Sequence, residues 1–123
     1  MSKKNDTGKA GETVACSYLQ GCGYTILQTN WRFHRYELDI VATDGRELVV
    51  VEVKTRAVDY LVSPEKSVGR SKIQRIAAAA DAYVQKYDVT LPVRFDVISL
   101  TQNGQICRVF EHIQDAFFAP VNG

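Results

Sequence analysis

Hydrophobic and polar residues recur along the chain with two periods, one typical of helices and one of strands. From about Thr7 to Gly21, apolar side chains return every three or four positions, and Asp6 or Thr7 can cap a helix there. A second stripe of this kind runs from about Arg70 to Tyr87. The polar residues 1–6 predict a flexible N-terminal tail. The pattern therefore predicts two helices.

The remaining apolar segments have the length and the turn signals of strands. "TDG" at 43–45 and "NG" at 103–104 supply the positive φ that tight hairpin turns need. Residues 57–69 have no clear period and predict a loop, and the tail from Gln114 predicts a short turn or helix. The predicted strands cover 24–33, 36–43, 46–56, 91–100 and 105–113.

The element order α-β-β-β-α-β-β predicts the fold class. Helices and strands alternate only in part, so we expect an α/β protein with a mixed five-stranded sheet and a helix on each face. No repeat, low-complexity tract or domain boundary interrupts the sequence. Residues 7–123 are therefore expected to form a single domain.

Composition narrows the function classes. A formal net charge of +1 gives no global basic field, so a nucleic-acid partner would require a local basic patch. The three cysteines lack ligand spacing, which argues against a disulfide scaffold or a zinc site. No apolar run is long enough to span a membrane, and no signal peptide is visible. We expect a cytoplasmic protein with no membrane partner.

The segment "YELDIVATDGRELVVVEVKTR" carries charges where strands should be buried. Strand side chains alternate between faces, so Glu37 and Asp39 are expected on one face, with Leu38 and Ile40 together on the other. In the next strand, Glu52 and Lys54 share a face. Pairing around the "TDG" turn brings Asp39 close to Glu52, with Lys54 just beyond.

Two carboxylates at this distance repel each other unless something neutralises them. A divalent cation does so, and Asp and Glu oxygens suit Mg²⁺ or Mn²⁺. Lys54 would then complement charge on a phosphate or position the attacking water. The alternative is a solvated hairpin face with cross-strand Glu–Lys pairs. Without metal, the first interpretation predicts a raised pKa for Asp39 or Glu52, and no loss of stability in Glu52→Gln.

Basic residues supply candidates for contacts with nucleic acid. In "NWRFHRY", Arg32 and Arg35 alternate with aromatic residues, a pattern that could hold a strand by stacking and phosphate contact. The alternative is a hairpin with an aromatic core face and a basic outer face. Four further cations could bind phosphates or could form a solvated surface: Arg56, Arg70, Lys72 and Arg75.

Four other polar residues are interpreted as structural or as non-ligands. Arg94 and Asp96 lie two apart in a predicted strand, which favours an ion pair that stabilises the fold. The two histidines are far apart in sequence, and neither is expected to bind a metal.

Beyond these local patterns, the sequence resembles a known group of proteins. "ELDIV" followed by "VVVEVKTR" resembles the core of the PD-(D/E)xK nuclease superfamily. Over nearly the whole chain, "GKAGETVACSYLQGCGYTILQTNWR", the Lys of "GRSKIQRIAAAADAYV" and "RFDVISL" are similar to the YraN family. That family consists of small bacterial proteins akin to archaeal Holliday-junction resolvases.

The resemblance implies a restriction-endonuclease-like fold and a set of roles. Asp39 and Glu52 match the metal-binding pair, and Lys54 matches the catalytic lysine. Glu12 matches an acidic residue that the N-terminal helix contributes to the metal site. Glu37 matches the Glu of a Gly-Glu-(Ile/Leu)-Asp motif whose usual glycine is Tyr36 in this chain.

These observations lead to one expected function and one alternative. We expect a Mg²⁺- or Mn²⁺-dependent endonuclease that hydrolyses DNA, with branched or flapped DNA among its candidate substrates and a homodimer as a candidate assembly. The alternative is a non-catalytic nucleic-acid-binding or adaptor protein on a nuclease fold.

Overall fold

The computed structural model describes residues 3–57 and 69–118 of the 123-residue chain. Their elements follow the predicted order α-β-β-β-α-β-β, which confirms an α/β fold of the restriction-endonuclease-like type. The predicted loop at 57–69 lies mostly outside the described residues. The elements are α1 (Lys3–Gly21), β1 (Thr25–Phe33), β2 (Tyr36–Thr43), β3 (Leu48–Ala57), α2 (Arg70–Lys86), β4 (Val93–Asn103) and β5 (Ile106–Phe117).

Two element boundaries differ from the prediction. Helix α1 begins at Lys3, so the expected tail at 1–6 was wrong from Lys3 onward. Lysine favours helices, and no glycine or proline precedes Thr7 to stop one. Strand β5 continues to Phe117 where a turn or helix was expected. The Phe117 ring stacks on Phe95 of β4 with centroids 5.2 Å apart. This contact stabilises the pairing of β5 with β4 beyond a bulge.

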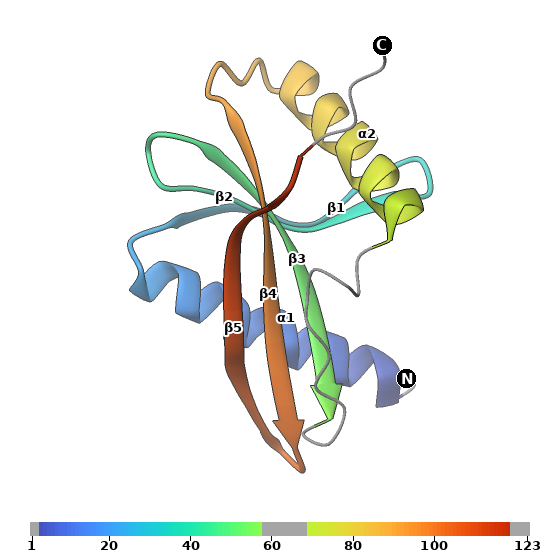
Figure 1. Ribbon diagram of the computed structural model, residues 1–123, viewed down its shortest axis with the longest axis vertical. Helices are drawn as coiled ribbons and strands as arrows, with labels where there is room; N and C mark the ends of the chain where they lie inside the picture. The colour runs from blue at the N-terminus through green and yellow to red at the C-terminus, as the bar shows by residue number, and fades with distance from the viewer. Residues whose placement is uncertain (1–2, 58–68, 119–123) are drawn as a thin grey trace.

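The sheet is mixed, with its strands in the order β1-β2-β3-β4-β5. All neighbours are antiparallel except β3 and β4, which are parallel. In Figure 1, the β1–β2 hairpin runs across the picture while β3, β4 and β5 run down it, so the two groups of strands diverge. No helix among the described residues has the length and apolar character needed to cross a membrane.

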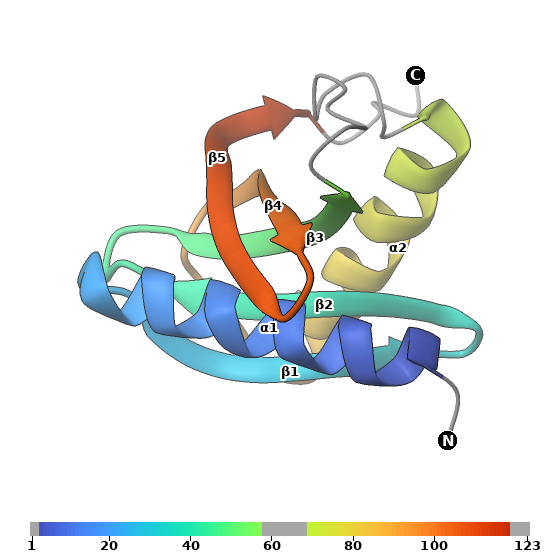
Figure 2. The same cartoon turned by 90° about the horizontal axis from the view of Figure 1, so that it is seen from below.

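Each face of the sheet has its own apolar core and its own helix, as predicted (Figure 2). On the α2 side, Leu48 and Val50 of β3 pack in a cluster with Ile76 and Tyr83 of α2. On the α1 side, Val49 and Val51 join a cluster that contains Ala15 and Leu19 of α1. The alternation predicted for β3 is therefore confirmed. It directs Glu52 and Lys54 toward the α2 side.

Helix α1 lies close to β3 at Gly11. A Cβ atom at this position would lie 2.8 Å from Thr55 Oγ1 and 3.2 Å from the Leu100 side chain. The absence of a side chain thus permits the close approach. This contact sets Glu12, the next residue in α1, near the sheet.

The prediction that Leu38 and Ile40 share a face was wrong. Leu38 packs in the core on the α2 side and Ile40 in the core on the α1 side, so the alternation of β2 breaks at Asp39. Strand β2 pairs with β3 only from Ile40 to Thr43, whereas it stays paired with β1 along most of its length. Asn30, which lies across from this break in β1, has φ +52. A local twist of the hairpin therefore changes the face.

A buried polar network joins β4 and β5 to α1. Asp96 is fully buried and accepts two hydrogen bonds from Arg94, at 2.8 and 2.9 Å, which confirms the predicted ion pair. His112 Nε2 lies 2.7 Å from the same carboxylate, and the Asp115 backbone N–H donates to it at 3.1 Å. In the tautomer that donates from Nε2, His112 Nδ1 accepts from the Tyr18 hydroxyl at 3.0 Å.

The network determines how Asp96 ionises. Burial alone would raise its pKa, but the hydrogen bonds from His112, Arg94 and the Asp115 backbone together lower the pKa of Asp96 below its usual value. The sequence pattern predicted the Arg94–Asp96 pair but not the contacts of His112 and Tyr18. Their separation of 94 residues leaves no local signal.

Asp96→Asn should destabilise the protein by about 3 kcal/mol at neutral pH, because one amide oxygen cannot replace two carboxylate oxygens beside a buried guanidinium. Since the folded pKa is lowered, the contribution of Asp96 exists above the unfolded value of 3.8 and is lost as pH falls further. Urea denaturation at several pH values measures both effects. Asp81→Asn, on the exposed side of α2, is the control, and an equal change in the two variants would contradict the role of the network.

Candidate active site

Asp39 lies where β2 separates from β3. The last pair between these strands in this direction is Ile40 with Val51, so the β3 backbone beyond it lacks a partner from β2. The Asp39 carboxylate supplies one, because Oδ2 accepts a hydrogen bond from the Val53 N–H at 2.9 Å. The side chain is thereby fixed beside the segment of β3 that carries Glu52 and Lys54.

A polar pocket of about 170 Å³ opens at this point between the β1–β2 hairpin, β3 and α2. It contains Asp39 and Glu52 together. A larger apolar cavity of about 270 Å³ lies between α2 and the end of β5, and none of the predicted site residues lines it. The polar pocket is lined by Arg35, Tyr36, Glu37, Asp39, Glu52, Lys72, Arg75 and Ile76.

Glu52 is held between two lysines. The residue is 5% exposed, and its Oε1 lies 2.6 Å from Lys72 Nζ of α2 and 3.4 Å from Lys54 Nζ of β3. The structure thus brings Asp39, Glu52 and Lys54 together as predicted, and it adds Lys72. No feature of the sequence pairs Lys72 with Glu52, because the contact depends on how α2 lies across the sheet.

The ionisable groups around Glu52 have pKa values that are shifted in different directions. Burial, followed by the charge of Glu52, raises the pKa of Asp39 to about 7, although the Val53 hydrogen bond opposes this shift. Burial and the neighbouring Lys72 lower the pKa of Lys54. For Lys72, burial is outweighed by hydrogen bonding and ion pairing with Glu52, so its pKa is raised. One member of the carboxylate pair therefore carries the expected raised pKa.

Glu12 and Glu37 lie beside this pair in different ways. Glu37 lines the pocket, and one oxygen lies 4.0 Å from Arg32 Nε. Glu12 does not line the pocket. Its Oε1 accepts a hydrogen bond from Asn30 at 2.6 Å. Burial and then the charge of Glu37 raise the pKa of Glu12 despite that bond, and the charge of Glu12 contributes to the raised pKa of Asp39.

The chemistry of these groups fits a hard cation held by two carboxylates. Among the described side chains, those of residues 10–56 and 69–118, no three His, Cys, Asp or Glu groups lie close enough together to hold a metal ion, so the predicted set of Asp39, Glu52 and Glu12 is not assembled. Asp39 and Glu52 alone still fit Mg²⁺ or Mn²⁺, which commonly use one or two carboxylates and complete their shell with water and phosphate oxygens. The raised pKa of Asp39 shows that a positive charge there would be favourable.

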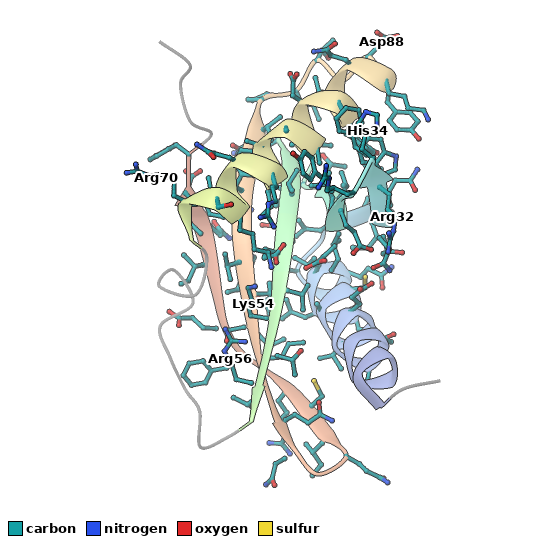
Figure 3. All side chains as sticks on the ribbon, turned by 90° about the vertical axis from the view of Figure 1, so that its right-hand side faces the viewer. Arg32, His34, Lys54, Arg56, Arg70 and Asp88 are labelled. Atoms are coloured by element: carbon teal, nitrogen blue, oxygen red, sulfur yellow. The ribbon has the colours of Figure 1, made fainter. Side chains whose placement is uncertain are left out.

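The five predicted nucleic-acid-binding residues do not form one patch. Lys72 and Arg35 line the pocket. Figure 3 shows Arg32 beside the hairpin, Arg56 farther along β3 than Lys54, and Arg70 at the start of α2. Arg70 lines a separate hollow with Ile73 and Gln74. A local basic patch at the pocket therefore includes only two of the five.

Asp39→Asn should stabilise the metal-free protein at high pH. Because the folded pKa is raised from 3.8 to about 7, ionisation of Asp39 weakens the wild type as pH rises through this window. The variant lacks that penalty and can still accept the Val53 hydrogen bond. Its advantage should grow from pH 4 to about 8 and reach on the order of 1–2 kcal/mol. Urea midpoints in EDTA measure it, and an advantage independent of pH would refute the shift.

Glu52→Gln should have the opposite effect in EDTA. The sequence pattern predicted no loss of stability, but Glu52 has two ammonium partners, and its neutralisation removes the carboxylate charge that both of them contact. We now expect a loss of about 1–2 kcal/mol, reduced by the hydrogen bond that Gln can still accept. The same urea series tests it. Unchanged stability at neutral pH would mean that the lysine pairs contribute little.

Comparison with known sequences places the chain among bacterial relatives. Residues 11–100 match the group described as "Uncharacterised protein family UPF0102". A UPF0102 protein of Parabacteroides distasonis is 52% identical over 120 residues, covering 98% of both chains. One from Bacteroides thetaiotaomicron is 45% identical over 98% of this chain and 99% of its own. One from Porphyromonas gingivalis is 48% identical over 95% of this chain and 87% of its own.

The matched region contains the carboxylate pair, both lysines and Glu12, so the site described above lies within the part shared with these relatives. The similarity also extends over nearly the whole chain. The chain belongs to the UPF0102 family, also called YraN.

Proposed function

We propose that this protein is a metal-dependent nuclease that hydrolyses phosphodiester bonds, with DNA, including branched DNA, as its substrate class. The observation that carries the proposal is the Asp39–Glu52 pair, which lines one polar pocket where β2 separates from β3, with the Lys54 ammonium group 3.4 Å from Glu52. A structural ion pair does not require a second carboxylate whose pKa is raised to about 7. Perturbed carboxylates in a pocket are typical of catalytic sites.

Each residue has a distinct task in this proposal. Asp39 and Glu52 would hold Mg²⁺ or Mn²⁺, which when bound activates water and offsets phosphate charge. Lys54 presents an ammonium group to the reacting phosphate and stabilises the charge that develops there. Lys72 orients Glu52 through the 2.6 Å ion pair. Glu12 and Glu37 keep the local field negative, which favours the cation.

One observation favours the alternative of a non-catalytic nucleic-acid-binding or adaptor protein. Glu52 is already neutralised by Lys72 and Lys54, so the pair carries less uncompensated charge than two isolated carboxylates would. In that case the cations of the pocket would bind phosphates without turnover. Cleavage, rather than binding, separates the two functions.

A cleavage assay on linear, flapped and four-way DNA tests the proposal. Wild-type protein should cut at least one of these with Mg²⁺ or Mn²⁺ and none in EDTA. Asp39→Asn should lose metal affinity and activity, whereas Lys54→Ala should retain metal affinity and lose about 100-fold in turnover. Asp81→Asn and Lys86→Ala, on the far part of α2, are charge-matched controls. Full activity in Asp39→Asn, or no cleavage of any substrate by wild type, would refute the nuclease.

A further inference from the structure

The carboxylate pocket continues into a second polar hollow of about 450 Å³. Arg35, Tyr36 and Arg75 line this hollow, and the same three residues also line the carboxylate pocket. The two spaces therefore share a wall. A nucleic-acid strand with one phosphate at the Asp39–Glu52 pair would have its neighbouring nucleotide next to this hollow.

Two guanidinium groups, those of Arg35 and Arg75, flank the hollow. Arg35 lies in the turn between β1 and β2, Arg75 lies on α2, and both are exposed. Neither forms an ion pair or a hydrogen bond with any other described residue. By contrast, Arg32 approaches Glu37 and Lys72 approaches Glu52. Unpaired guanidinium groups from two different elements are well suited to phosphate, which they contact through paired N–H donors.

Tyr36 supplies an aromatic surface between these two cations. It is the first residue of β2, and it pairs with Phe33 across the hairpin. One part of the side chain packs against the core on the α2 side, while the residue as a whole is only partly buried. An aromatic ring fixed by the core and open to a polar hollow is the arrangement on which a nucleobase stacks.

We propose that Arg35, Tyr36 and Arg75 form a subsite for one unpaired nucleotide, next to the phosphodiester that the carboxylate pair receives. The base stacks on Tyr36, and the two arginines hold its phosphates. This inference rests on the proposed function, because that function defines which phosphodiester is cut. A base within a continuous duplex has both faces covered by its neighbours, so the subsite selects single strands, flaps or branch points.

The test measures binding in EDTA, where no metal-dependent cleavage occurs. The probe is a fluorescein-labelled single strand of about 12 nucleotides, as DNA and as RNA, compared with the blunt DNA duplex of the same sequence. Fluorescence anisotropy gives the dissociation constant at several salt concentrations. Tyr36→Leu removes the ring but keeps an apolar contact with the core, and Tyr36→Phe keeps the ring. Arg75→Gln is matched with Arg108→Gln, an exposed arginine on β5.

The wild type should bind the single strand more tightly than the duplex. Tyr36→Leu should weaken binding about tenfold, and Tyr36→Phe should not, because stacking requires only the ring. Arg75→Gln should reduce the slope of log affinity against log salt by about 0.7, as expected for the loss of one phosphate contact, while Arg108→Gln leaves the slope unchanged. Dependence on the ring in either the DNA or the RNA series supports the subsite and identifies the preferred sugar.

The subsite is overturned if Tyr36→Leu binds as the wild type does, if duplex and single strand bind equally, or if the two arginine variants change together. Failure of the nuclease would be seen differently. A protein that cuts nothing with metal, yet binds single strands through Tyr36 and Arg75, keeps the subsite and loses the catalytic role. A protein that cuts DNA without regard to Tyr36 keeps the nuclease and loses the subsite.

Discussion

The hydrogen bond from the Val53 N–H to Asp39 Oδ2 is the contact on which the site depends. It forms where β2 separates from β3. There the Asp39 side chain, instead of the β2 backbone, accepts the hydrogen bond of the β3 N–H group. The same divergence opens the pocket, because the β1–β2 hairpin moves away from β3 beneath α2. A carboxylate that satisfies the backbone is therefore also fixed beside Glu52. The divergence of β2 from β3 therefore determines both the opening of the pocket and the position of Asp39 beside Glu52.

Two aspartates, Asp96 and Asp39, have opposite electrostatic surroundings. Asp96 receives hydrogen bonds from Arg94, His112 and a backbone N–H, so its pKa is lowered even though it is fully buried. Desolvation and then the charge of Glu52 raise the pKa of Asp39 to about 7, because its one backbone hydrogen bond does not offset them. The first carboxylate stabilises the fold by staying ionised. The second is poorly compensated, which is the arrangement that the proposed cation site requires.

Much of this arrangement was predictable from sequence, and the exceptions have physical reasons. The period-two alternation of β3 correctly predicted that Glu52 and Lys54 lie on one face. The rule holds there because both faces of the strand pack against a core, which fixes its register. The same rule failed in β2, where twist at Asn30 and Asp39 moves Leu38 to the other face. Lys72 was a candidate for phosphate contact, but its ion pair with Glu52 depends on how α2 is docked. Glu12 was expected to bind metal directly and instead bonds Asn30.

We propose that Asp39 and Glu52 form a cation site in the folded protein. The most direct test is the affinity of the protein for Mn²⁺, measured by electron paramagnetic resonance of the free ion across a pH series. Because a proton and a cation compete for Asp39, affinity should rise as pH increases through about 7, and the rise should be absent in Asp39→Asn. Asp81→Asn should behave as the wild type does. Affinity that is independent of pH, or equal in the wild type and Asp39→Asn, would contradict the account.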